Sequence, residues 1–159
     1  MAAAKQDGAF DASKAMRVHD HRHTVTCHCG DVRGSFRCSD ATIKVWDCNC
    51  SDCSMRGNAH FVIPGNSFHI EGSRGDYQAK TTLYLWGTKT AQRRFCKRCG
   101  ILPWYVPRSN PDGVAITYAC ATFAKDDTPQ IEKCQYDGIN WEKSHAESSI
   151  SKESKEEES

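Results

Sequence analysis

The sequence has no long run of apolar residues and almost no net charge. No stretch is both long enough and apolar enough to span a bilayer, so no membrane association is expected. The formal net charge is only +1 over 159 residues, and bulk charge therefore does not favour a nucleic-acid partner. We expect a protein of the cytoplasm, with the nucleus as a second location.

A long helical period is also missing, which argues against a helical bundle or an α/β fold. Short segments rich in strand-forming residues follow one another every eight to twelve residues or so, the spacing of a sandwich or coiled sheet. One helical turn is expected at 51–56, ended by Gly57. The fold class predicted is mainly β with few short helical turns, and strands are expected at 24–27, 32–38, 43–46, 60–63, 68–70, 81–86, 90–95, 102–106, 114–119 and 131–136.

The length suggests one domain with polar segments on either side. We expect residues 1–23 to be a flexible lead-in, in which His19, His21 and His23 are solvated. Residues 24–143 form the predicted folded domain. Residues 144–159 hold five glutamates and two lysines, and we expect them to be a disordered acidic tail.

Cysteine is the residue that the sequence has in excess, with ten in all. Cys38, Cys120 and Cys134 stand alone. The other seven fall into three groups that the spacing makes obvious: Cys27 and Cys29; Cys48, Cys50 and Cys53; Cys96 and Cys99. Zinc takes four protein ligands in a closed structural site and commonly three in an open, reactive one. Seven clustered cysteines therefore suggest one site of each kind.

The spacing also indicates which groups belong together. Cys96 and Cys99, followed by Gly100, are typical of a zinc knuckle, which needs two more sulfurs. A turn at Gly30 would let the C-x-C pair supply them. We therefore predict a closed, structural zinc at Cys27, Cys29, Cys96 and Cys99. The middle group can cap one face of a metal and leave its fourth position free, which predicts an open zinc at Cys48, Cys50 and Cys53.

Three other uses of these cysteines stay open at this point. Disulfides are one, although no apolar signal segment opens the chain and such spacings in reducing compartments are more often metal sites. An iron–sulfur cluster is another, but the repeated C-x2-C spacing is absent. The third is a second closed zinc whose fourth ligand is His60 or His28. His28 stands between two ligands, so its side chain should point away from the metal.

A zinc ion held by three thiolates favours a particular chemistry. The thiolates donate charge to the metal, so a bound water should be acidified less than on a zinc held by neutral histidines. A soft, sulfur-rich site favours a thiol as its fourth ligand, and binding would hold that thiol as a thiolate against a free pKa of about 8.5. The predicted chemistry is addition of a thiol to a carbonyl-like carbon, or the reverse elimination.

Three motifs carry a resemblance to a known family. They are Thr-Cys-His-Cys-Gly-Asp-Val-Arg at 26–33, Cys-Asn-Cys-Ser-Asp-Cys at 48–53 and Arg-Phe-Cys-Lys-Arg-Cys-Gly at 94–100. In this order and with all seven cysteines, the chain resembles the glutathione-dependent formaldehyde-activating enzyme family from about residue 24 to 143. The segments 47–51, 95–100, 105–111 and 137–142 are most similar to its centromere protein V branch.

The resemblance implies an Mss4-like β fold with two zinc ions, a structural one at Cys27, Cys29, Cys96 and Cys99 and a catalytic one at Cys48, Cys50 and Cys53. The family activity would be a carbon–sulfur lyase reaction that makes S-(hydroxymethyl)glutathione from glutathione and formaldehyde. A small thiol and an aldehyde are then the expected partners. The alternative implied by the closer branch is a non-catalytic zinc module that associates with a protein partner of chromatin or the cytoskeleton.

No residue specifies glutathione among thiols from the sequence alone. Four arginines near the cysteine groups could meet a substrate carboxylate, although each is more often a solvated surface charge: Arg56, Arg93, Arg94 and Arg98. Arg56 is the first candidate because it follows Cys53 by three residues.

Overall fold

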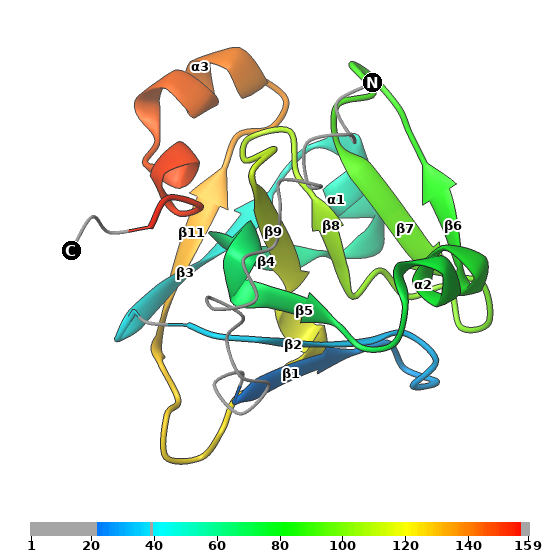
Figure 1. Ribbon diagram of the computed structural model, residues 1–159. Coiled ribbons are helices and arrows are strands. Elements are labelled where there is room, and N and C mark those ends of the chain that lie inside the picture. The colour runs from blue at the N-terminus through cyan, green and yellow to red at the C-terminus, as the bar shows by residue number, and fades with distance from the viewer. Residues whose placement is uncertain (1–21, 39, 157–159) are drawn as a thin grey trace.

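The computed structural model describes residues 22–38 and 40–156, which form two β-sheets with short helices around them (Figure 1). The smaller sheet has the strand order β10-β1-β2-β5, with β1 (His23–Thr26), β2 (Arg33–Phe36), β5 (Phe68–Ile70) and β10 (Ala121–Thr122). The larger sheet has the order β11-β3-β4-β9-β8-β7-β6, with β3 (Thr42–Cys48), β4 (Ala59–Pro64), β6 (Thr81–Tyr84), β7 (Gln92–Cys96), β8 (Trp104–Val106), β9 (Gly113–Thr117) and β11 (Gln130–Tyr136).

Helices are few and short. The described residues contain α1 (Ser51–Arg56), α2 (Arg74–Lys80) and α3 (Trp141–Glu147), and the 3₁₀ turns η3 (Gly65–Ser67), η4 (Tyr118–Cys120) and η5 (Ile150–Lys152). The predicted mainly β, Mss4-like architecture is confirmed, and so is the helical turn at 51–56. The two-residue strand β10 and the helix α2 were not predicted. α2 begins with a capping box between Ser73 and Asp76, which is a local sequence signal for the start of a helix.

Alternate residues of the larger sheet serve two different cores. On one face Phe61, Ile63 and Ile116 pack against the smaller sheet. On the other face Val62 and Ala115 join a second cluster of buried side chains. Because successive side chains of a strand point to opposite faces, both faces of this sheet are apolar and both need a cover.

One strand pair places the functional site. β11 runs parallel to β3, with Gln130 opposite Thr42 and Tyr136 opposite Cys48. A parallel partner needs a long connection, and here nearly the whole domain lies between the two strands. The register brings the loop after β11 directly beside the end of β3, where the middle cysteine group begins.

The C-terminal segment covers the second face of the larger sheet, as the orange and red ribbon beside β11 and β3 shows (Figure 1). Ile150 is 2% exposed. The side chain of Asn110 donates a hydrogen bond to the carbonyl oxygen of Ile150 at 2.8 Å, and Trp46 Nε1 donates to the carboxylate of Glu153 at 2.9 Å. The prediction of a disordered tail from residue 144 is therefore wrong for 144–156. The prediction rested on the polar composition of the segment. A few of its side chains nevertheless pack against a face of the larger sheet, and the sequence alone does not show that this face is there.

The N-terminal boundary also differs slightly from the prediction. His23 belongs to β1 and is 1% exposed, and its Nδ1 accepts a hydrogen bond from the amide of Ala124 at 3.1 Å. The expectation of a solvated His23 is therefore wrong, because its ring packs against Phe36 and Phe123. His19, His21 and the rest of the lead-in lie outside the described residues.

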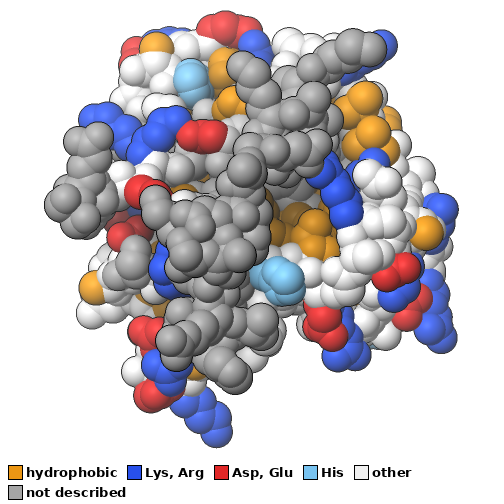
Figure 2. All heavy atoms as spheres, in the orientation of Figure 1, with side chains coloured by type: hydrophobic (Ala, Val, Ile, Leu, Met, Phe, Trp, Pro, Cys, Tyr) orange, Lys and Arg blue, Asp and Glu red, His pale blue; other side chains and the backbone are white. Residues whose placement is uncertain are grey.

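Two surface properties bear on partners. No helix in the described part of the chain combines the length and apolar character needed to cross a membrane. On the face shown in Figure 2, basic and acidic side chains of the described residues are interspersed. This pattern agrees with the near-zero formal charge of the whole sequence.

Candidate metal centres and active site

The seven clustered cysteines form the two clusters predicted from the sequence, one of four cysteines and one of three. The ligand atoms of Cys27, Cys29, Cys96 and Cys99 all lie within 4.8 Å of one another, and so do those of Cys48, Cys50 and Cys53. All ten cysteines are free thiols, which does not support the disulfide alternative. Within the described residues neither His28 nor His60 joins a cluster. Both clusters could hold a metal ion.

The four-cysteine cluster is built from two tight turns. The amide of Gly30 donates to the carbonyl of Cys27 at 3.1 Å, and that of Gly100 donates to the carbonyl of Cys96 at 2.9 Å. Both glycines have positive φ, at 83° and 75°, as the two predicted turns require. His28, between the first two sulfurs, is exposed and does not join the cluster.

The spacing of these sulfurs suits a tetrahedral metal. Sγ of Cys29 lies 3.6 Å from Sγ of Cys27 and 3.6 Å from Sγ of Cys96. Sulfurs at 2.3 Å from a tetrahedral zinc would lie about 3.8 Å apart. The amide of Val32 also donates to Sγ of Cys27 at 3.3 Å, a contact that orients the ligand. The donor set fits zinc without further ligands.

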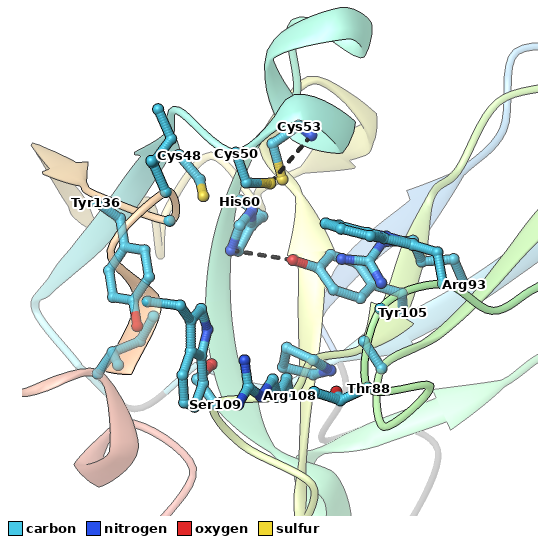
Figure 3. A pocket seen from close by; sticks show the side chains of 18 of the residues that line it. Cys48, Cys50, Cys53, His60, Thr88, Arg93, Tyr105, Arg108, Ser109 and Tyr136 are labelled. Atoms are coloured by element: carbon cyan, nitrogen blue, oxygen red, sulfur yellow. Dashed lines mark hydrogen bonds between the residues drawn. The ribbon is translucent and has the colours of Figure 1, made fainter. Parts of the chain in front are cut away.

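The three-cysteine cluster lies where β3 ends and α1 begins. Cys50 is the N-cap of α1, and its sulfur accepts a hydrogen bond from the amide of Cys53 at 3.4 Å (Figure 3). The thiols of Cys48 and Cys53 also hydrogen-bond to Cys50 and lower its pKa, so the cluster already favours one thiolate. Gly57, with φ of 60°, ends the helix as predicted.

The loop after β11 fits closely over this cluster. A Cβ atom on Gly138 would lie 2.5 Å from Sγ of Cys48 and 2.9 Å from Cβ of Cys50. The loop is fixed by Asn49, whose amide group donates to Asp137 at 2.9 Å and accepts from the amide of Ile139 at 3.1 Å. Glycine is therefore required at position 138 for a steric reason, because no larger side chain fits beside the sulfurs.

A cavity of about 270 Å³ opens beside the three cysteines (Figure 3). Its walls come from β3, β4, β7, β8 and β11 of the larger sheet, from α1 and from the C-terminal segment. The lining residues with aromatic or basic side chains are His60, Trp86, Arg93, Tyr105, Arg108, Tyr136 and Trp141. The four-cysteine cluster does not line this cavity. The two clusters thus differ in surroundings as well as in the number of sulfurs.

His60 and Tyr105 form a buried pair on the cavity wall. Nε2 of His60 lies 3.2 Å from the Tyr105 hydroxyl, and the two rings meet edge to face (Figure 3). Burial lowers the pKa of His60 to about 4, and the positive charge of Arg93 adds to the shift. Burial likewise raises the pKa of Tyr105 well above its usual value. Both groups are therefore neutral near pH 7.

Several buried polar atoms on the wall have no hydrogen-bond partner in the described part of the chain. They are Nδ1 of His60, Nε1 of Trp86, Nε of Arg93 and the hydroxyl of Tyr136. Buried polar groups are nearly always paired, with protein or with bound molecules. Bound water or a polar ligand would pair with these groups.

The four arginines that the sequence offered as carboxylate-binding candidates lie in different surroundings. Arg98 is 72% exposed and pairs with Asp31 at 3.5 Å, and Arg94 lies over the ring of Tyr77. Arg56 pairs with Asp52 but does not line the cavity. Only Arg93 of the four lines it, so the first candidate chosen from the sequence was not the one that reaches the site.

Other residues of the cavity had no role assigned from the sequence. Tyr105, Arg108 and Trp141 belong to motifs quoted for the resemblance, but nothing local indicated that they meet. The signal available was strand alternation, which puts Arg93 and Tyr105 opposite each other and on one face. This signal identifies the pair only when β7 and β8 are known to be neighbouring strands, and the sequence does not give the strand order.

Most of the described chain matches a known protein family. Residues 22–136 match the model of the family described as glutathione-dependent formaldehyde-activating enzyme. A crystal structure of a Rhodobacter sphaeroides protein is similar, with a TM-score of 0.53 and 28% sequence identity, over 70% of this chain and 99% of that chain. The family match ends at the last residue of β11. Gly138, Trp141 and Ile150 line the cavity from beyond it.

Proposed function

Because the chain belongs to the glutathione-dependent formaldehyde-activating enzyme family, we propose that it is a zinc-dependent carbon–sulfur lyase. It forms or cleaves a thiol–aldehyde adduct such as S-(hydroxymethyl)glutathione, with the substrate sulfur at Cys48, Cys50 and Cys53. The motifs at 105–111 and 137–142 support a place near the centromere protein V-like branch of the family.

One observation supports this proposal above the others. The three-sulfur cluster opens on a cavity of about 270 Å³ that polar groups surround, whereas the four-sulfur cluster does not line that cavity. A three-ligand site with space beside it is the arrangement of a reactive zinc, and a four-ligand site is that of a structural one. We assign the catalytic role to Cys48, Cys50 and Cys53, and the structural role to Cys27, Cys29, Cys96 and Cys99.

The chemistry divides between the metal and the chain. Zinc held by the three cysteines would supply a soft position for the substrate sulfur as a thiolate. The new bond joins that sulfur to the carbonyl carbon of the aldehyde. The carbonyl π pair becomes a lone pair on oxygen, and that oxygen takes up the proton which the thiol lost. Tyr105 and His60, neutral and hydrogen-bonded on the wall, are the groups of the chain that can hold the adduct oxygen or its proton.

The second function expected from the sequence was a non-catalytic zinc module bound to chromatin or the cytoskeleton. That function requires an inert middle cluster, which the experiment below examines directly. The cytoplasmic location follows from the reducing conditions that free thiols require and stays a prediction, as does the nuclear one.

The test is the rate of exchange between formaldehyde, glutathione and their adduct, followed by exchange NMR with and without zinc-loaded protein. We expect wild type to accelerate exchange and Cys53→Ser to leave it at the spontaneous rate. Cys134→Ser is the matched control, because Cys134 lies outside both clusters, and it should behave as wild type. No acceleration by wild type would overturn the lyase proposal and favour the binding module.

A further inference from the structure

Arg93 places a guanidinium group inside the cavity. Its residue is 7% exposed, and its Cζ lies 5.0 Å from the ring centre of Tyr105 and 5.6 Å from that of Trp86. Figure 3 shows the side chain reaching from β7 over the Tyr105 ring toward the cavity. Two aromatic faces thus hold the group in a fixed orientation, which suits recognition of a planar anion.

The charge of Arg93 is only partly compensated. Nε of Arg93 lies 2.6 Å from Oδ2 of Asp52, an ion pair by distance without the alignment of a hydrogen bond. Nη2 of Arg56 lies 2.7 Å from the same oxygen. The side chains of Arg93, Asp52 and Arg56 are 9%, 12% and 22% exposed. One carboxylate therefore serves two guanidinium groups in a poorly solvated place, and further negative charge must come from the cysteine sulfurs or from a bound anion.

The other arginine of the cavity differs in this respect. Arg108 stacks on the ring of Trp141 at 3.6 Å, and its Nη2 lies 3.1 Å from Oε1 of Glu142. The Glu142 side chain is 79% exposed, so this pair lies at the solvent edge and has one anion for one cation. Arg93 is thus the cavity arginine that must share its carboxylate with a second guanidinium group. Burying two cations beside one carboxylate is costly, and a bound anion would lower that cost.

We infer that Arg93 binds a carboxylate of the thiol substrate, so that the cavity selects thiols that carry an anionic group. This inference rests on the proposed function, since the ligand is the thiol of that reaction. Guanidinium and carboxylate match in two parallel hydrogen bonds. Nε1 of Trp86, buried and without a hydrogen-bond partner among the described residues, belongs to a ring that Arg93 contacts. The cavity also has more space than an aldehyde and a sulfur atom alone would fill.

The test measures binding rather than turnover, with three small thiols that differ in their far group. Calorimetric titration of the zinc-loaded protein would use 3-mercaptopropionate, 2-mercaptoethanol and cysteamine, which carry a carboxylate, a hydroxyl and an ammonium group. We expect the carboxylate to bind about tenfold more tightly than the hydroxyl, as one charged hydrogen-bonded contact gives. Cysteamine should bind most weakly, because its charge repeats that of Arg93.

Three variants assign the preference to one residue. Arg93→Gln should bind the three thiols alike, and Arg93→Lys should recover part of the preference because it restores the charge without the planar fork. Arg94→Gln is the matched control. Arg94 is the next residue of β7, lies over Tyr77 and does not line the cavity, so its loss should leave the preference unchanged. Circular dichroism and zinc content show that each variant is folded and loaded.

The outcomes separate this inference from the proposed function. Equal binding of the three thiols by wild type, or no binding, overturns the role of Arg93, and so does a preference that persists in Arg93→Gln. The charge would then serve the cysteine sulfurs alone. Absence of formaldehyde exchange with every thiol, together with a carboxylate preference that Arg93→Gln abolishes, would overturn the lyase reaction and leave the anionic binding site standing.

Discussion

At the scale of single residues, Gly138 shows how closely the chain fits around the three cysteines. A methyl group there would meet Sγ of Cys48 at 2.5 Å and Cβ of Cys50 at 2.9 Å, both far inside van der Waals contact. The loop cannot easily withdraw, because Asn49 holds it through Asp137 and the amide of Ile139. The cysteines, rather than the loop, should give way to a larger residue.

Gly138→Ala is therefore expected to displace Cys48 and weaken the three-cysteine metal site, with little effect on the four-cysteine site. Overpacking of this kind costs about 1 to 3 kcal/mol, which corresponds to a loss in affinity on the order of tenfold or more. A competition titration of zinc against a chromogenic chelator, resolved into two sites, measures it. The weaker site alone should shift.

The control for this substitution is Gly75→Ala. Gly75 lies in α2, and a Cβ there would have no contact closer than 3.8 Å, to Oγ of Ser73. Alanine is the better helix former, so this variant should be neutral or more stable by up to about 1 kcal/mol. Equal zinc affinity of Gly138→Ala and wild type would show that the cluster adapts, and that the close fit has no role in holding metal.

At the scale of elements, the C-terminal segment acts as the cover of a sheet face. Lys44 donates to Ser149 Oγ at 2.9 Å, and Ser154 donates to Asp112 at 2.7 Å. A Cβ on Gly113 would lie 2.6 Å from Cβ of Ser154, so strand and segment are in close contact. The same segment supplies Ile150 to the cavity wall. The segment therefore both covers the sheet face and completes the cavity.

Glu153 makes this docking depend on pH. Burial raises the pKa of Glu153 to about 7, against the opposing hydrogen bonds from Trp46. Since the folded pKa lies above the unfolded value of about 4.3, the folded state binds the proton more tightly. Its contribution is fully present below about pH 4 and is lost as the pH rises to about 7. The gain in melting temperature of Glu153→Gln over wild type should therefore be about 2 to 4 °C larger at pH 8 than at pH 5.

Thermal unfolding of zinc-loaded protein at the two pH values measures this difference. Zinc binding also depends on pH, but it does so equally in both proteins and cancels from the comparison. Glu147→Gln, at an exposed position of α3, is the control and should show the same offset from wild type at both pH values. A constant offset for Glu153→Gln as well would mean that Glu153 is solvated and that Trp46 does not hold the segment.

Local features of the fold and of the cysteine groups could be predicted from the sequence, whereas their arrangement in space could not. The strands and the turns at Gly30, Gly57 and Gly100 follow from neighbouring residues, and so does the convergence of sulfurs within each group. The parallel pairing of β11 with β3, the cover at 144–156 and the meeting of Arg93 with Asp52 depend on strand order. Strand order is set by contacts between residues far apart in the sequence, which no local pattern records.

At the scale of the whole molecule, the two cysteine clusters differ in what they connect. Cys27 and Cys29 lie at the turn between β1 and β2 in the smaller sheet, whereas Cys96 and Cys99 lie at the turn between β7 and β8 in the larger one. A metal ion at this cluster would join the two sheets across a long chain separation. Cys48, Cys50 and Cys53 belong to six consecutive residues and join only β3 to α1.

Loss of one ligand should therefore have unequal consequences. Cys99→Ser is expected to cost about 3 to 5 kcal/mol, the range of a cross-link that closes a long loop, because it releases one sheet from the other. Cys53→Ser should cost less than about 2 kcal/mol while removing the middle metal. Urea unfolding with zinc present measures both, and Cys120→Ser, outside both clusters, corrects for the loss of a partly buried thiol. Equal destabilisation by Cys99→Ser and Cys53→Ser would contradict the division into a structural and a catalytic centre, since two sites that stabilise the fold alike have no such division.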